Sequence, residues 1–214
     1  MRFATAFWTL LALLSVAAPP STAPAAAQQS APSLQALLDR FGEMPGMSAE
    51  FREEKRIALL AVPVRSQGVL YFAPPGKLMR QVTSPSPSYA LLEGGTLTFA
   101  SQGERQVLQV NENPVVAGFV QIFRFVLAGD RSALERTYHV DYETDGARWT
   151  LTLKPKNEAL GRFLDRMVLE GEGYAVERMT MTEVSGDTTV TEFSNVNPRR
   201  RFTPTEQRRL FRVP

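Results

Sequence analysis

The sequence predicts a mainly β protein of about eleven antiparallel strands, with one apolar helix packed against them. From Met47 to Asn195, short runs of alternating apolar and polar residues have the period of strands with one buried face. Turn-forming residues separate the runs every 8 to 12 residues or so, which favours an antiparallel meander, sandwich or barrel over βαβ units. One stretch without this alternation, residues 114–128, is almost entirely apolar and predicts a buried helix.

The first 27 residues have the composition of a cleavable export signal. Arg2 precedes an apolar run over 3–18, and Ala25 to Ala27 form an A-x-A site, so cleavage is expected after Ala27. The remainder, 28–214, has the size of one domain. The chain contains no cysteine, which excludes disulfides and a lipid-modified cysteine. We therefore expect a periplasmic protein that is soluble once the signal is removed.

A first helix is predicted directly after Ser33. This serine can cap it, and Leu34, Leu37, Leu38 and Phe41 follow at helical spacing on one stripe. Such a stripe requires another element to pack against.

The first strand is predicted to run from Met47 to Leu59. Its polar side carries alternate residues from Ser48 to Arg56. Its apolar side carries Met47, Ala49, Phe51, Ile57 and Leu59. Glu53 and Lys55 interrupt the apolar side, so they are expected at a cavity rim or paired with each other, with a bulge between them as a further option.

Ten further strands are predicted from the same alternation. They span 67–73, 77–83, 89–93, 96–101, 105–110, 137–144, 148–154, 163–170, 174–183 and 188–194. The connections between them carry turn chemistry such as Gly94-Gly95 and Asp145-Gly146.

Clear boundary residues flank the apolar helix. Asn113 can cap it, Pro114 suits the first helical position, and Gly129 follows its end. At this length the helix is too short to span a bilayer, so it is expected inside the sheet or across its mouth. Asp130 can cap a short following helix that continues through Arg136.

Charge is strongly segregated along the chain. The formal net charge is +2, yet residues 198–214 contain six arginines and one glutamate, so the rest of the chain is acidic. We interpret Arg199, Arg200 and Arg201 as a contact for a membrane or an acidic partner, with a solvated end as the alternative. Nucleic acid is not an expected partner for an exported protein with an acidic body.

Catalytic residue types are scarce, and no enzymatic activity is expected. The only histidine, His139, is predicted on the polar face of a strand, and neither a G-x-S-x-G elbow nor a phosphate-binding loop is present. Glu170 and Glu172 could in principle form a glycosidase pair, but nothing distinguishes them from the other acidic residues. No metal site and no cofactor are expected.

Apolar residues are abundant on the predicted strands and on the helix. Methionine and phenylalanine adapt to variable apolar ligands, so we interpret part of this apolar surface as a lipid-binding cavity, with an ordinary core as the alternative. The predicted cavity residues are Phe51, Leu70, Phe72, Leu78, Phe99, Trp149, Leu151, Met167 and Met179. A movable lid is predicted from Phe119, Ile122, Phe123 and Val126.

Three short motifs resemble the LolA family of periplasmic lipoprotein carriers. They are Phe51 on an early strand, a "G-x-L" strand at 66–72, and a "P-G-x-x-R" step at 74–80. The resemblance implies an incomplete antiparallel barrel of about eleven strands, with helices forming a lid over a hydrophobic cavity for acyl chains. It also implies that Arg80, the arginine of the "P-G-x-x-R" step, closes the lid. Gln81 replaces a tryptophan that is frequent in the family, and residues 84–88 are unusually rich in proline.

These departures suggest a divergent branch, so another acylated lipid is as plausible a cargo as a lipoprotein. The expected function is a monomeric carrier that shuttles such cargo between membranes. Inner-membrane export machinery would load it, and an outer-membrane acceptor would unload it. The alternative is an interaction module of the same fold that senses envelope lipid without transporting it.

Overall fold

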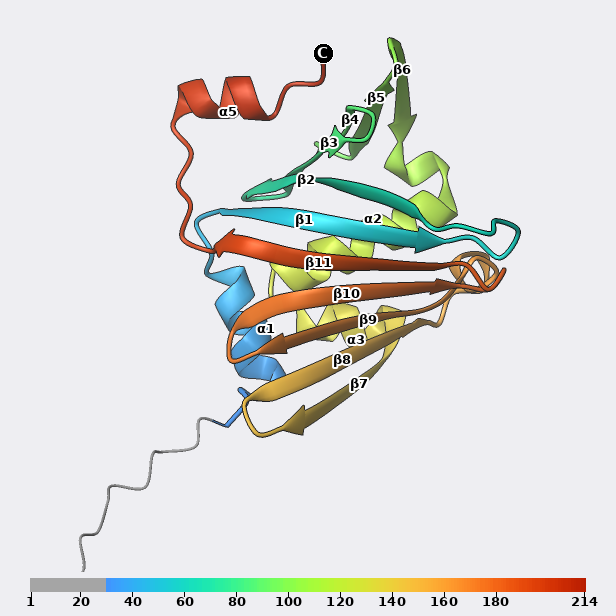
Figure 1. The fold of residues 1–214 in the computed structure, drawn as a ribbon. Helices are drawn as coiled ribbons and strands as arrows, with labels where there is room; N and C mark the ends of the chain where they lie inside the picture. Colours follow the sequence, from blue (N-terminus) through green and yellow to red (C-terminus); the bar gives the residue numbers. More distant parts are fainter. Residues whose placement is uncertain (1–29) are drawn as a thin grey trace, which may run out of the picture.

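A computed structural model describes residues 30–214 as one antiparallel sheet of eleven strands with helices on both faces (Figure 1). The predicted signal and its cleavage site lie outside the described residues. The strands are β1 Met47–Arg56, β2 Val64–Ala73, β3 Lys77–Ser84, β4 Ser88–Glu93, β5 Thr96–Ser101, β6 Glu104–Gln109, β7 Tyr138–Asp145, β8 Arg148–Pro155, β9 Leu164–Glu172, β10 Ala175–Glu183 and β11 Thr188–Asn197. The helices are α1 Leu34–Gly42, the 3₁₀ turn η1 Val110–Glu112, α2 Pro114–Leu127, α3 Arg131–Thr137, α4 Glu158–Gly161 and α5 Pro204–Leu210.

The order of the strands is β6-β5-β4-β3-β2-β1-β11-β10-β9-β8-β7. Strands that follow one another in sequence pair, except β6 and β7, and at the centre of the sheet β1 pairs with β11. The first and last strands therefore join two antiparallel meanders into one sheet, whose edges are β6 and β7. The predicted mainly β fold with about eleven strands is confirmed, and the sheet is open.

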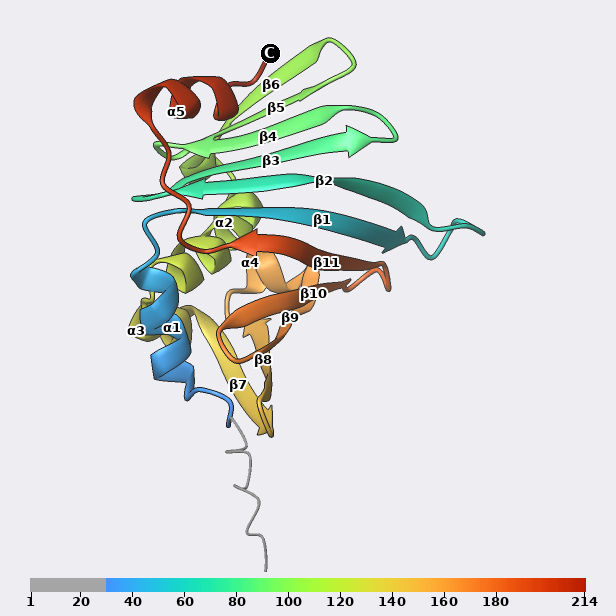
Figure 2. The ribbon, with the colours of Figure 1, turned by 60° about the vertical axis from the view of Figure 1, so that its left-hand side comes forward.

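Strand alternation divides the sheet into two faces with different cover. On β1 to β3, cross-strand pairing places Phe51, Leu70 and Leu78 on one side, which we call the inner face. Helix α1 and the C-terminal half of α2 pack against the inner face in the main hydrophobic cluster, and α4 packs beside them (Figure 2). Tyr71 and Met79 point to the outer face, where α5 lies.

The sequence predicts the first three α-helices well because their caps are local. The Ser33 side chain accepts a hydrogen bond from the Ala36 N–H at 3.2 Å and starts α1. The Asn113 side chain accepts from the N–H groups of Val115 and Val116 at 3.1 Å and starts α2. Asp130 caps α3 through the Ala133 N–H at 2.9 Å. Within residues 30–214, no helix is both long and apolar enough to cross a membrane.

The prediction that the first strand continues to Leu59 is wrong. β1 ends at Arg56, and Leu59 is 95% exposed in the loop to β2. A turn closed by the Leu60 N–H and the Ile57 carbonyl (2.9 Å) ends the strand, and Asp187 accepts a hydrogen bond from the Ala58 N–H. The loop projects from the end of the sheet far from α1 (Figures 1 and 2).

The C-terminal segment is folded over residues 202–213, and its arginines Arg208, Arg209 and Arg212 are exposed. Thr203 and Glu206 form a capping box, and Pro204 stands in the first turn of α5. Phe202, Leu210, Phe211 and Val213 belong to a hydrophobic cluster on the outer face. These apolar residues, which lie between the arginines, were not part of the prediction for this segment.

Candidate functional site

A largely apolar cavity of about 690 Å³ lies between the helices and the inner face of the sheet. Its volume is within the range of small-molecule sites, about 300–1,000 Å³. Side chains of α1 and the following turn, α2, β1 to β3 and β9 to β11 enclose it. The apolar lining consists of Phe41, Met44, Pro45, Met47, Ala49, Leu70, Leu78, Ile122, Phe123, Val126, Leu127, Met167, Leu169, Ala175, Val176, Met179, Phe193, Val196 and Pro198.

Helix α2 covers the cavity with its C-terminal half, which contributes Ile122, Phe123, Val126 and Leu127. Phe123 and Leu127 are only partly buried, so this part of the cover packs less tightly than a closed core. The C-terminal half of α2 therefore presents apolar, partly exposed side chains to the cavity.

The N-terminal half of α2 is fixed to the rest of the protein. The buried Tyr138 hydroxyl donates a hydrogen bond of 2.7 Å to the Gly118 carbonyl, and burial raises the pKa of Tyr138 to about 12. A Cβ on Gly118 would lie 2.6 Å from Leu160, so only glycine permits this approach. One end of the cover is thus anchored by close packing.

The predicted cover residue Phe119 belongs to this anchored half. It packs against the main hydrophobic cluster but does not line the cavity. Ile122, Phe123 and Val126 do line it, as does Leu127, which the sequence analysis did not single out.

A polar cluster continues the inner face of β1 beyond the cavity. Glu53 accepts hydrogen bonds from Arg80 at 2.8 Å, from Thr191 at 3.2 Å and from Ser66 at 3.4 Å. The Arg80 guanidinium also lies over the Phe51 ring, 4.6 Å from its centroid. Arg80 therefore faces the inner side of the sheet, although its hydrogen bond is to β1 and not to α2.

None of the three options considered for Glu53 and Lys55 is found: they do not pair with each other, neither lines the cavity, and the pairing irregularity of β1 lies at Ser48 and Glu50. Lys55 instead binds Glu183 at 2.8 Å, across β11. Both charged residues share the inner face because they are two residues apart, and each finds an opposite charge on a different strand. The first strand therefore changes from an apolar half at the cavity to a charged half beyond it.

Polar side chains gather at the rim of the cavity, where it opens at the start of β1 and the end of β11. The rim residues are Arg40, Glu43, Tyr174, Arg199 and Arg201. Arg40 and Glu43 are 3.8 Å apart and both exposed, a weak surface pair. Sequence reasoning could not place Arg40 and Glu43 here, because they come from the end of α1 and meet the C-terminal segment only in the fold.

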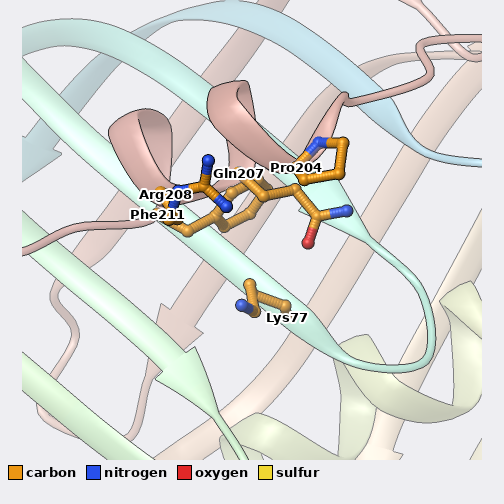
Figure 3. Close-up of a pocket in the computed structure, with 5 residues that line it drawn as sticks. All are labelled: Lys77, Pro204, Gln207, Arg208 and Phe211. Atoms are coloured by element: carbon orange, nitrogen blue, oxygen red, sulfur yellow. The ribbon is translucent and has the colours of Figure 1, made fainter.

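A second pocket, of about 450 Å³, lies on the outer face beneath α5 (Figure 3). Figure 3 shows Lys77 of β3 opposite Pro204, Gln207 and Arg208 of α5 and the following Phe211. The Lys77 ammonium is 5.7 Å from the centroid of the Phe211 ring and pairs with Glu93. This pocket has a mixed polar and apolar lining, and none of the residues predicted for the site lines it.

One protein family matches the part of the chain that contains the whole sheet. The family described as outer membrane lipoprotein carrier protein LolA-like matches residues 25–197. The chain belongs to this LolA-like family. The predicted resemblance is confirmed, and the family is one of carriers that are typically not enzymes.

Solved structures similar to this LolA-like protein share little sequence with it. A LolA superfamily protein from Nitrosomonas europaea is 13% identical, with a TM-score of 0.46 over 83% of this chain and 97% of that one. A putative outer membrane lipoprotein-sorting protein domain from Vibrio parahaemolyticus is 10% identical, with a TM-score of 0.48 over 83% and 96%. The MucA/MucB complex of Pseudomonas aeruginosa matches at 11% identity and a TM-score of 0.44, over 81% and 60%. No significant match was found among curated proteins.

The LolA-like fold brings together part of the predicted cavity. Leu70, Leu78, Met167 and Met179 line it. Phe51, Phe72, Trp149 and Leu151 are buried in the core without lining it. Phe99 stands apart on β5 and is 39% exposed.

Sequence reasoning missed several cavity residues, such as Met44 in the turn after α1, Val176 near the start of β10 and Phe193 in β11. Strand alternation gives the face of a residue, but not its position along a curved sheet. Among residues 30–214, no group of three or more acidic or histidine side chains is placed to hold a metal ion.

Proposed function

We propose that this LolA-like protein is a periplasmic carrier that encloses the acyl chain of a lipoprotein or another lipid and shuttles it between membranes. The observation that carries the proposal is the apolar cavity between α2 and the inner face of the sheet. Inner-membrane export machinery would load the carrier, and an outer-membrane acceptor would unload it.

The energetics require a cavity that can open and close. Burying one methylene group gains about 0.8 kcal/mol, so a fully enclosed sixteen-carbon chain gains on the order of 12 kcal/mol. A chain held this strongly leaves slowly unless the cover moves. The C-terminal half of α2 is suited to such movement, because Phe123 and Leu127 are only partly buried while Gly118 is fixed to Leu160 and Tyr138.

Arg80 could act on the cavity through Phe51, which lies beside the cavity wall on β1. Its guanidinium stacks on Phe51, whose inner-face neighbour on β1 is the cavity residue Ala49. We propose that the Glu53–Arg80 pair holds Phe51 in place and favours the closed state of the empty carrier.

Charged substitutions on the cover test the carrier directly. In the double variant Phe123→Asp/Leu127→Asp, two carboxylates would face the cavity, so binding of a fluorescent fatty-acid analogue is expected to fall at least tenfold. Both side chains are partly buried, and the fold is expected to survive. Equilibrium titration of delipidated protein, with circular dichroism as a check on folding, measures the effect.

Phe163→Asp is the matched control, because Phe163 is a 55% exposed phenylalanine outside the cavity. Its affinity for the analogue is expected to equal that of the wild type. Unchanged binding in the folded double variant would contradict the proposal and favour the interaction module.

A further inference from the structure

Three consecutive arginines follow β11, and the structure separates them into two groups. Arg199 and Arg201 line the rim of the cavity. Arg200, between them, donates a hydrogen bond of 2.6 Å to Glu206 of the α5 capping box. In an extended segment successive side chains point to opposite sides, so this alternation follows from the backbone.

The backbone of this segment is held in place. Gly46 forms a parallel bridge with Arg199, and the Arg199 N–H donates to the Asn197 side chain at 3.1 Å. A Cβ on Gly46 would lie 2.5 Å from the Arg200 carbonyl oxygen. Phe202 then packs edge-on against Tyr71 on the outer face, with the ring centroids 6.1 Å apart. Arg199 and Arg201 are therefore fixed at the rim and do not belong to a free tail.

The rim has an excess of positive charge. Glu43 is the acidic residue among those that line the cavity, and it is near Arg40. At this end of the sheet, Arg40 pairs with Glu43 and Arg200 pairs with Glu206. Arg199 and Arg201 are exposed and have no acidic partner among residues 30–214. Two guanidinium groups thus stand beside the opening of an apolar cavity.

We infer that the cargo carries an anionic group, a phosphate or a carboxylate, next to its acyl chain, and that Arg199 and Arg201 bind this group at the rim. The inference rests on the proposed carrier function. Guanidinium groups bind phosphate and carboxylate oxygens through paired hydrogen bonds, which neutral glycerol or alcohol headgroups cannot match. With the acyl chain in the cavity, the headgroup of such a lipid would remain at the opening, where these two side chains lie.

The test compares two lipids with the same oleoyl chain, lysophosphatidic acid and monooleoylglycerol. Each displaces a fluorescent fatty-acid analogue from the delipidated protein. The wild type is expected to bind the anionic lipid about five- to tenfold more tightly than the neutral one. In the double variant Arg199→Gln/Arg201→Gln, this preference is expected to disappear while affinity for monooleoylglycerol stays the same.

The charge-matched control is Arg208→Gln/Arg209→Gln, which removes two arginines from α5 on the outer face. Its preference for the anionic lipid is expected to equal that of the wild type. Loss of preference in both double variants would show that net charge alone is responsible and would overturn the assignment to Arg199 and Arg201.

Inorganic phosphate distinguishes a headgroup site from a site for the free ion. We expect phosphate alone to bind the lipid-free protein at least a hundredfold more weakly than lysophosphatidic acid, because it gains nothing from the cavity. Comparable affinities would overturn the inference.

Two outcomes separate the inference from the proposed function. Equal affinity for both lipids, unaffected by Arg199→Gln/Arg201→Gln, would overturn the anionic headgroup and leave acyl binding in place. Failure of the protein to bind either lipid would overturn the carrier proposal and the inference together.

Discussion

At the scale of single residues, Glu53 is the centre of a hydrogen-bonded cluster on the inner face of the sheet. Its carboxylate interacts with Arg80, Ser66 and Thr191, which come from three different strands, and its side chain is 21% exposed. A hydrogen bond to a charged group contributes about 1.5–3 kcal/mol to stability. This cluster therefore links β1, β2, β3 and β11 beside the cavity floor.

Removing the Arg80 charge tests both its structural and its proposed closing role. Arg80→Leu leaves Glu53 without its cation and is expected to lower the free energy of unfolding by about 1–3 kcal/mol. If Arg80 favours the closed state, the variant is also expected to take up the fatty-acid analogue several times faster in stopped-flow mixing.

Arg178→Leu is the matched control, because Arg178 pairs with Glu192 at 2.9 Å on the exposed outer side of β10 and β11. An exposed pair contributes about 0.2–1 kcal/mol, and we expect no effect on uptake. Identical uptake by wild type and Arg80→Leu would refute the closing role.

At the scale of elements, α2 combines close contacts near both ends with partly buried side chains between them. Tyr138 and Leu160 fix Gly118, and Ala128 at the C-terminal cap packs backbone to backbone against Gly42 of α1. Between these two contacts, Phe123 and Leu127 face the cavity. The proposed movement therefore belongs to the middle of α2, between the close contacts at Gly118 and Ala128.

The buried hydrogen bond from Tyr138 to the Gly118 carbonyl predicts that stability falls at high pH. Burial raises the pKa of Tyr138 from 10.0 to about 12, so the unfolded chain loses this proton first as the pH rises. The contribution of Tyr138 to the free energy of unfolding is fully present below about pH 10. It declines between about pH 10 and 12, by about 1 kcal/mol at pH 11. Urea denaturation at pH 8 and pH 11 measures the decline, and Tyr138→Phe is expected to lack this component. An equal decline in both proteins would contradict the anchor assignment.

At the scale of the whole molecule, the two faces of the sheet have different functions in the fold. The inner face and helices α1 to α4 form the core and the cavity, whereas α5 and its flanking residues cover apolar side chains of β2 to β5 on the outer face. The sheet ends also differ: the cavity opens at one end, and the other carries the exposed apolar loop with Leu59 and Val62.

Helix α5 and its flanking residues are expected to detach from the outer face without unfolding of the core. Phe211→Ala removes a buried ring that contacts Tyr71 and Phe202, which is expected to release α5 and expose Arg208 and Arg209 to trypsin. Mass spectrometry of short digests should show rapid cleavage in this segment alone. Phe163→Ala, at an exposed position, serves as the control. If trypsin cleaves Phe211→Ala no faster than the wild type, the packing role of Phe211 beneath α5 is contradicted.

The sequence predicts the elements of this fold better than their contacts. Local signals such as Asn113 before Pro114, or alternation along β1, specify helix starts and strand faces. The pairing of β1 with β11 and the arrival of Arg199 at the cavity rim depend on contacts between residues more than 130 positions apart in the sequence. Phe99 illustrates the limit, because it has the predicted face but lies two strands beyond the cavity wall at β3.

Native mass spectrometry of the protein, purified from a periplasm without detergent and followed by organic extraction, tests the central claim most directly. We expect a co-purifying acylated species at one copy per protein, lost in Phe123→Asp/Leu127→Asp and retained in Phe163→Asp. A single lipid-free mass, from protein that also fails to take up added fatty acid, would contradict the claim.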